Sequence, residues 1–145
     1  DDNYFDSVSA YDLFEHILRV HIVNEKTKFP FVELMSEVYR VLKPGGQLYA
    51  VTPVYPEESA FVDPTHVNFI TLNSYKYFIT PHNWAKMYGF RGSFVKKRVS
   101  VVNFEIEEKK FSFIKLISTN LSSMIRGAFV GKPLVTMLLM VAKTG

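Results

Sequence analysis

The fold class follows from the stretch FVELMSEVYRVLKPGGQLYAVTPV, residues 31–54. Its first half predicts a helix over residues 31–42, because apolar side chains recur there at helical spacing. The members of this apolar stripe are Phe31, Leu34, Met35, Val38, Val41 and Leu42. A Pro-Gly-Gly segment at residues 44–46 then ends the helix. The second half predicts a strand over residues 47–54, so the stretch contributes one helix and one strand in succession.

The segment before this stretch predicts a further strand and a further helix. Residues 4–11 are expected to form a buried strand, with Phe5, Val8 and Ala10 as apolar members. Asp12 is placed to cap a helix that follows, with Glu15 at the third helical position as in a capping box. The polar residues 21–30 are expected to form a loop.

The segment after the stretch alternates loops, helical pieces and strands. Residues 55–69 are loop-like, and residues 71–87 hold helical pieces that start at Asn73 and Pro81. Strands are predicted over residues 94–105 and 134–143. We expect Tyr75 and Phe78 to face inward on one helical piece, and Trp84 and Met87 on the next. Residues 111–125 have helical spacing and residues 127–133 a turn composition, so a helical insert at about 111–133 precedes the last strand.

Strands that alternate with helices indicate an α/β protein, and the 145 residues suffice for one domain. The net charge of +3 is small, and its densest run, Lys96-Lys97-Arg98, is expected to be a solvated strand end and not a nucleic-acid surface. There is no cysteine, so disulfides, thiolate zinc sites and cysteine nucleophiles are excluded.

The most apolar run, at residues 134–142, has nine residues where a membrane-spanning helix needs about twenty. The first residues are acidic and polar, unlike a signal peptide. We therefore expect a cytoplasmic protein.

Three short motifs occur in a recognisable order. FDSV at residues 5–8 leads to DLFEHI at residues 12–17, and RVLKPGG follows at residues 40–46. DPTHV at residues 63–67 comes after the strand that ends in Thr52-Pro53. In this order the motifs resemble those of class I S-adenosylmethionine-dependent methyltransferases, although Leu13 and Phe14 stand where the family more often has a hydrophobic residue and then Leu.

The resemblance implies a Rossmann-like methyltransferase fold, of which this chain holds the half-sheet with the family's fourth to seventh strands. The last strand is then antiparallel and lies between the strands predicted at residues 47–54 and 94–105. Beyond Val67 the resemblance rests only on the order of elements.

The chain lacks two features that precede this half in the family. One is the loop Gly-x-Gly-x-Gly, whose glycines let the backbone approach the cofactor, and the other is the acid that binds the ribose hydroxyls. The gap corresponds to at least two strand-helix units, on the order of 60 to 100 residues. We therefore expect residues 1–145 to be a partial domain. Alone, it should be inactive and should bind S-adenosylmethionine weakly or not at all.

The resemblance assigns the cofactor to the end of the first strand. Ala10, Tyr11, Asp12 and His16 are implied to line the S-adenosylmethionine site. The alternatives are that Asp12 only caps a helix and that His16 is a polar neighbour on a helix surface. Glu15 is interpreted as a capping partner and not as a base.

The substrate is assigned to the loop after the second strand. Tyr55, Asp63 and His66 are the candidates for substrate contact, and His66 is the candidate catalytic base because a histidine side chain can accept a proton near neutral pH. Alternatively, Asp63 makes a turn and His66 only pins the loop. Trp84 is expected in the core. No metal site is expected, since His21 and His82 have no ligand spacing with other residues.

The function implied by the resemblance is methyl transfer from S-adenosylmethionine to a small-molecule or lipid-like acceptor. Two alternatives stay open: a non-catalytic remnant or interaction module that pairs with another chain, and another doubly wound protein such as a nucleotide-binding enzyme. We also expect the strand at residues 4–11 to leave an open sheet edge. Either a second copy of the chain or a missing N-terminal half would cover that edge.

Overall fold

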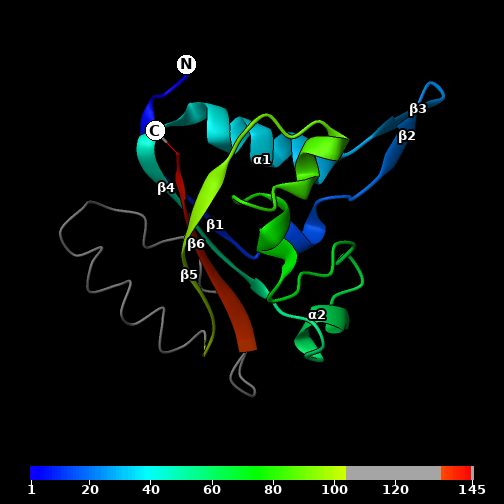
Figure 1. Ribbon diagram of the computed structural model, residues 1–145. Helices are drawn as coiled ribbons and strands as arrows, with labels where there is room; N and C mark the ends of the chain where they lie inside the picture. Colours follow the sequence, from blue (N-terminus) through cyan, green and yellow to red (C-terminus); the bar gives the residue numbers. More distant parts are fainter. Residues whose placement is uncertain (104–134, 145) are drawn as a thin grey trace.

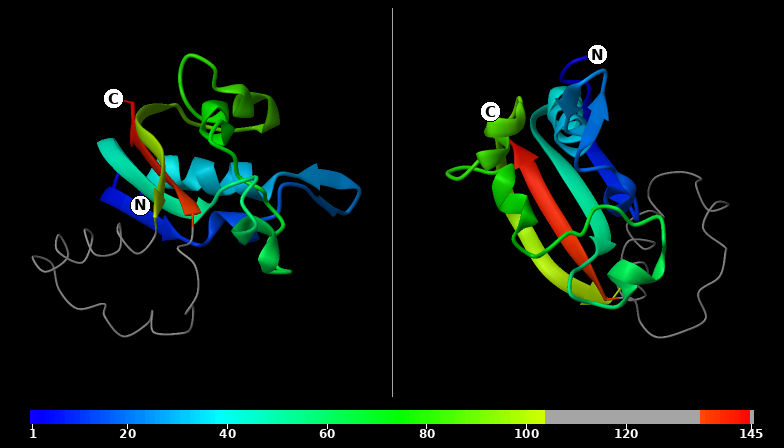
Figure 2. Two further views of the ribbon diagram at one scale, coloured as in Figure 1. Left: turned by 90° about the horizontal axis from the view of Figure 1, so that it is seen from below. Right: turned by 90° about the vertical axis from the view of Figure 1, so that its right-hand side faces the viewer.

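The computed structural model describes residues 1–103 and 135–144, so the expected helical insert at about 111–133 lies outside the described residues (Figure 1). A four-stranded sheet has the order β1-β4-β6-β5. Its four strands are β1 (Phe5–Tyr11), β4 (Leu42–Pro53), β5 (Phe94–Asn103) and β6 (Val135–Lys143). In the right-hand view of Figure 2 they lie side by side.

The directions of the strands agree with the predicted topology. β1 and β4 are parallel, with Ala10 opposite Ala50 and Tyr11 opposite Val51. β6 is antiparallel to both β4 and β5 and lies between them. The expectation of a final antiparallel strand inserted between the two preceding ones is therefore confirmed.

The helix α1 (Pro30–Val41) joins the two parallel strands. Proline occupies its first turn, where a missing N–H costs nothing. Met35 and Val38 from the predicted stripe are buried against the sheet, and β4 begins at Leu42, which is fully buried. The strand therefore follows the helix directly, and it begins at residue 42 instead of the predicted residue 47.

The chain between β1 and α1 differs from its prediction. No helix opens at Asp12: a single 3-10 turn, η1 (Phe14–His16), forms there, and no side chain caps it. Instead, a hairpin follows where a loop was expected, made of β2 (His21–Val23) and β3 (Lys26–Lys28). The two residues between these strands, Asn24 and Glu25, have positive φ angles of 49° and 63°, which suit a two-residue hairpin turn.

The connection from β4 to β5 contains only short helices. They are α2 (Ser59–Val62), η2 (Ser74–Tyr77) and η3 (Trp84–Tyr88). Phe78 is buried as predicted, but Trp84 is 45% exposed and Met87 80% exposed, so the core position predicted for both is wrong. The piece is a 3-10 turn that starts after Asn83 in a left-handed conformation, and this turns Ala85 inward instead.

The core lies between one face of the sheet, α1 and the segment of residues 71–90. Aromatic rings dominate it: Phe31 contacts Phe78, and Phe78 contacts Phe90. Phe94 and Leu48 of the sheet are completely buried beneath them. None of the helices in the described part of the chain has the length and apolar character needed to cross a bilayer.

Candidate functional site

The candidate site lies where the two parallel strands end. β1 ends at Tyr11 and β4 at Pro53, and in open α/β sheets ligands bind beyond the carboxyl ends of such strands. Asp12, Glu15 and His16 follow β1 directly, and the chain after β4 folds back with α2 beside that end (Figure 1).

Glu15 ties the two segments together. Its side chain is only 2% exposed, and its Oε2 accepts a hydrogen bond from the Thr52 hydroxyl at 2.9 Å. Its backbone carbonyl accepts from the N–H groups of Val67 and Asn68 at 2.8 and 2.9 Å. The interpretation of Glu15 as a capping partner is therefore wrong. The bond to the end of β4 holds this carboxylate and keeps the segment from continuing as a helix.

Two further residues fix the same junction and were missed by the sequence analysis. Asn68 is buried and donates through Nδ2 to the Phe14 carbonyl at 3.0 Å. Arg19 donates through Nε to Asn68 Oδ1 at 2.6 Å and through Nη2 to the Phe69 carbonyl. No motif marks these contacts, because the partners lie about fifty residues apart.

His16 lies against the loop that carries Asp63. The Thr65 hydroxyl donates to Asp63 Oδ1 at 2.6 Å, and the Thr65 N–H donates to the same oxygen at 2.8 Å. These bonds lower the pKa of Asp63. They also form a turn, which is the alternative role that the sequence analysis gave to Asp63. The Thr65 hydroxyl also lies 3.0 Å from His16 Nδ1.

His66 points into the same corner from the loop. Its ring is 4.8 Å from the His16 ring, edge to face, and its Nδ1 lies 3.1 Å from the Ala60 carbonyl of α2. Its Nε2 is 4.0 Å from Asp63 Oδ2. The structure thus brings together His16 from one motif and Asp63 and His66 from another, about fifty residues later in the sequence.

Asp12 turns the chain at the end of β1. Its φ of 45° is left-handed, and its N–H donates to the Val51 carbonyl at 3.0 Å. It therefore does not cap a helix, contrary to that interpretation. Burial, helped by the Glu15 carboxylate, raises the pKa of Asp12 to about 6, while His66 and His16 act in the opposite direction.

The other candidates have different neighbours. Ala10 is buried in the core, and Tyr11 contacts Tyr49 with 5.7 Å between ring centroids. Burial raises the pKa of Tyr11 to about 12. Tyr55 packs on Phe61 of α2, which stacks in turn on Phe69.

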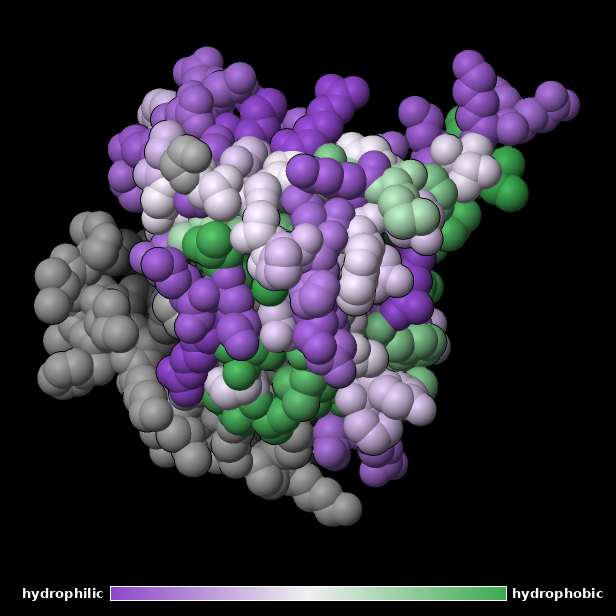
Figure 3. Space-filling model, viewed as in Figure 1, coloured by the Kyte–Doolittle hydropathy of each residue, from purple (hydrophilic) through white to green (hydrophobic). Residues whose placement is uncertain are grey.

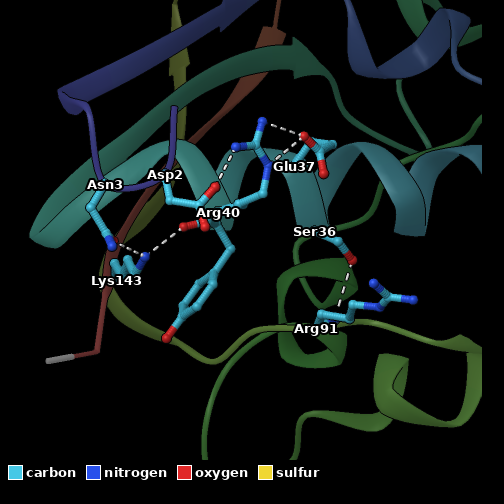
Figure 4. A pocket seen from close by; sticks show the side chains of 8 residues that line it. Asp2, Asn3, Ser36, Glu37, Arg40, Arg91 and Lys143 are labelled. Carbon is cyan, nitrogen blue, oxygen red and sulfur yellow. Dashed lines mark hydrogen bonds and ion pairs between the residues drawn. The ribbon is translucent and has the colours of Figure 1, made fainter.

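A hollow lies at the opposite end of the sheet, near the two termini, and Figure 4 shows the side chains that line it. Two of the cations that line it already have partners: Arg40 binds Asp2 and Glu37, and Lys143 binds Asn3. Figure 3 shows mainly hydrophilic side chains around this end. These contacts join the first residues to α1 and β6, which gives Arg40 and Lys143 a structural role.

Comparison with known proteins identifies the fold. No family model matches the chain, and no curated protein matches its sequence. Among solved structures, a chain of the complex between the Haloferax volcanii Trm112 methyltransferase activator and a protein described as a methyltransferase superposes with a TM-score of 0.51. The identity is 13%, and the match covers 100% of this chain and 57% of that one. The chain has a class I methyltransferase-like fold.

Other solved structures with this fold match at lower TM-scores. A SAM-dependent methyltransferase from Archaeoglobus fulgidus has a TM-score of 0.49 and 18% identity, with 98% of this chain and 61% of that one covered. Phosphoethanolamine N-methyltransferase 2 of Haemonchus contortus has a TM-score of 0.47 and 19% identity. The match covers 99% of this chain and 34% of that one. The chain therefore spans between 34% and 61% of the length of these three methyltransferase-like structures.

Proposed function

We propose that the chain forms part of an S-adenosylmethionine-dependent methyltransferase that acts on a small-molecule or lipid-like acceptor. The observation that carries the proposal is the meeting of His16, Asp63 and His66 beyond the carboxyl ends of β1 and β4. Two sequence motifs about fifty residues apart supply these groups. Sheets of this class bind ligands at this end.

The residues at the end of β1 fit one wall of a cofactor site. The chain turns at Asp12 in a left-handed conformation, and Asp12 and His16 follow the strand end directly. The Ala10 side chain is buried in the core, so only its backbone could line this space. The sequence contains no Gly-x-Gly-x-Gly loop. These 145 residues therefore have no loop of that kind to bind its part of the cofactor.

The chemistry at this wall would consist mainly of positioning. When bound, S-adenosylmethionine supplies a methyl group that its sulfonium already activates. Proximity and alignment then carry most of the rate. The carbonyl of Ala60 can only accept a hydrogen bond, so a neutral His66 is protonated at Nδ1 and keeps its lone pair on Nε2. That nitrogen is suited to take a proton from the acceptor, and the Asp63 carboxylate at 4.0 Å would stabilise the imidazolium.

Titration with S-adenosylhomocysteine, followed by backbone amide chemical shifts, tests the assignment. We expect shifts at Ala10, Tyr11, Asp12 and His16, with a dissociation constant in the millimolar range. Arg91, in the hollow at the other end of the sheet, is the internal control and should not shift. Binding in the low micromolar range, shifts confined to other regions, or no shift at saturating ligand would each contradict the proposed cofactor wall.

A further inference from the structure

Three potential ligand side chains gather in the corner between η1 and the loop after α2. Glu15, His16 and His66 each offer one oxygen or nitrogen atom, and these atoms lie within 4.8 Å of one another. The spacing of histidines along the sequence does not show this cluster, because His66 comes from a segment fifty residues away from His16.

The hydrogen bonds of the two imidazoles determine which nitrogens are free. His66 Nδ1 faces the Ala60 carbonyl, a pure acceptor, so it carries the proton. The Thr65 hydroxyl gives its own proton to Asp63, so it accepts from His16 Nδ1. Both neutral rings therefore keep a lone pair on Nε2. Histidines that bind metals show this arrangement, in which the other ring N–H donates to an oxygen and fixes the orientation of the ring.

Glu15 supplies an independent observation. Its Oε2 is held by Thr52, but its Oε1 is buried and has no hydrogen-bond partner among the described residues. An ionised carboxylate oxygen that loses water without gaining a partner is costly. A cation beside this oxygen would remove that cost. The carboxylates of Asp12 and Asp63 near the same corner add to the attraction for positive charge.

We propose that Glu15, His16 and His66 bind a divalent transition-metal ion through one carboxylate oxygen and two imidazole nitrogens. This donor set suits Zn²⁺ and its neighbours in the first row better than Ca²⁺ or Mg²⁺, which prefer oxygen ligands. Three protein ligands leave at least one position open to solvent or to an acceptor molecule.

The geometry requires only small adjustments. Ligand atoms at about 2.1 Å from one Zn²⁺ ion are at most about 4.2 Å apart. The ligand atoms are now up to 4.8 Å apart and must therefore move closer together. A small side-chain rotation is enough for this change. His16 is exposed, so there is room for a small rotation that keeps its Thr65 contact. Ala60 and Thr65 would then be the outer partners that orient the two rings.

The inference does not rest on the proposed methyl transfer, because the ligands and their partners all lie within this chain. It does affect the role of His66. A bound ion would occupy the lone pair that the proposed function uses for a proton, so the metal-bound and the basic forms are alternative states of one imidazole.

Zn²⁺ titration of the untagged protein by calorimetry, without any cofactor, tests the site. We expect one ion per chain with micromolar or tighter affinity, and at least tenfold weaker binding for His16→Gln. His16 is exposed, so this variant should fold normally, which circular dichroism can verify. His82→Gln is the matched control, because His82 is a histidine outside the cluster, and its binding should equal that of the wild type.

A second measurement reports the ligand set directly. Co²⁺ in place of Zn²⁺ should give visible absorption bands in the wild type, and Glu15→Gln should weaken or shift these bands. Gln keeps an oxygen acceptor for Thr52. Absence of one-to-one Zn²⁺ binding to the wild type would overturn the proposal, and so would equal binding by wild type and His16→Gln. An equal affinity for Mg²⁺ would overturn the choice of donor set.

Discussion

His66 has more contacts than a residue of an exposed loop usually has. Its side chain is 8% exposed, donates to the Ala60 carbonyl at 3.1 Å and packs against His16. We predict that His66→Ala lowers the free energy of unfolding by about 1–2 kcal/mol, because the Ala60 carbonyl loses its donor. His66→Asn keeps a side-chain donor and should cost less. If His66 is the base, both variants should reduce turnover of the active enzyme alike. Restored turnover in His66→Asn would contradict that role.

The backbone conformation of Asp12 is the basis of a separate prediction. At a φ of 45°, a residue with a Cβ atom and no local hydrogen bond is strained by about 1–2 kcal/mol, whereas glycine is not. Asp12→Ala should therefore be less stable than Asp12→Gly in urea unfolding. Asp6 in β1 is the control: the same two substitutions there should rank in the opposite order, because glycine weakens a strand. Identical rankings at both positions would show that the turn at Asp12 is not strained.

At the scale of elements, Lys143 at the end of β6 joins this strand to α1 and to the start of β4. Lys143 Nζ donates to the carbonyls of Tyr39 and Leu42, both at 2.9 Å, and lies 4.5 Å from the Tyr39 ring centroid. Lys143→Met should lower the free energy of unfolding by about 1–3 kcal/mol, because two carbonyls lose a charged donor. Lys97→Met on β5, an exposed lysine, is the control and should stay within about 0.5 kcal/mol. Equal effects of the two substitutions in chemical denaturation would contradict this role.

The elements that the sequence predicted well are those decided by local pattern. α1 and β4 follow from a helical stripe and a strong helix stop, and both formed. The helix expected from Asp12 failed because a contact with Thr52, 37 residues away, pins Glu15, and no local pattern contains that contact. The hairpin after it was missed because its strands are three residues long and largely polar.

The residues of the candidate site also divide into those that a local motif marks and those that only the fold reveals. His16, Asp63 and His66 were found because motifs mark them, and the fold brings them together. Arg19, Thr65 and Asn68 were missed because their role is to join segments, which a residue type alone does not reveal. The cluster that carries the metal proposal required knowledge of the fold, since its members are far apart in sequence.

At the scale of the whole molecule, one sheet edge is open within the described residues. β1 is the terminal strand of the sheet and pairs there only with β4. Most of its residues are exposed, and Phe5 is 46% exposed. An edge of this kind offers unpaired backbone groups to another strand. The helix that was expected to begin at Asp12 does not form, which leaves β1 itself as the contact element.

This edge leads us to predict a two-fold dimer in which β1 pairs with β1 of a second copy. Two-fold symmetry makes that pairing antiparallel and self-complementary, and it would extend two four-stranded sheets into one. Ser7→Lys should shift the equilibrium towards monomer, because like charges then face each other across the axis and edge lysines oppose pairing. Ile22→Lys adds the same charge to the exposed hairpin β2–β3, away from β1, and should leave the dimer intact. Sedimentation equilibrium over a range of concentrations measures both variants. A wild type that stays monomeric at high concentration would rule out the pairing, and equal dissociation of both variants would show that the contact lies elsewhere.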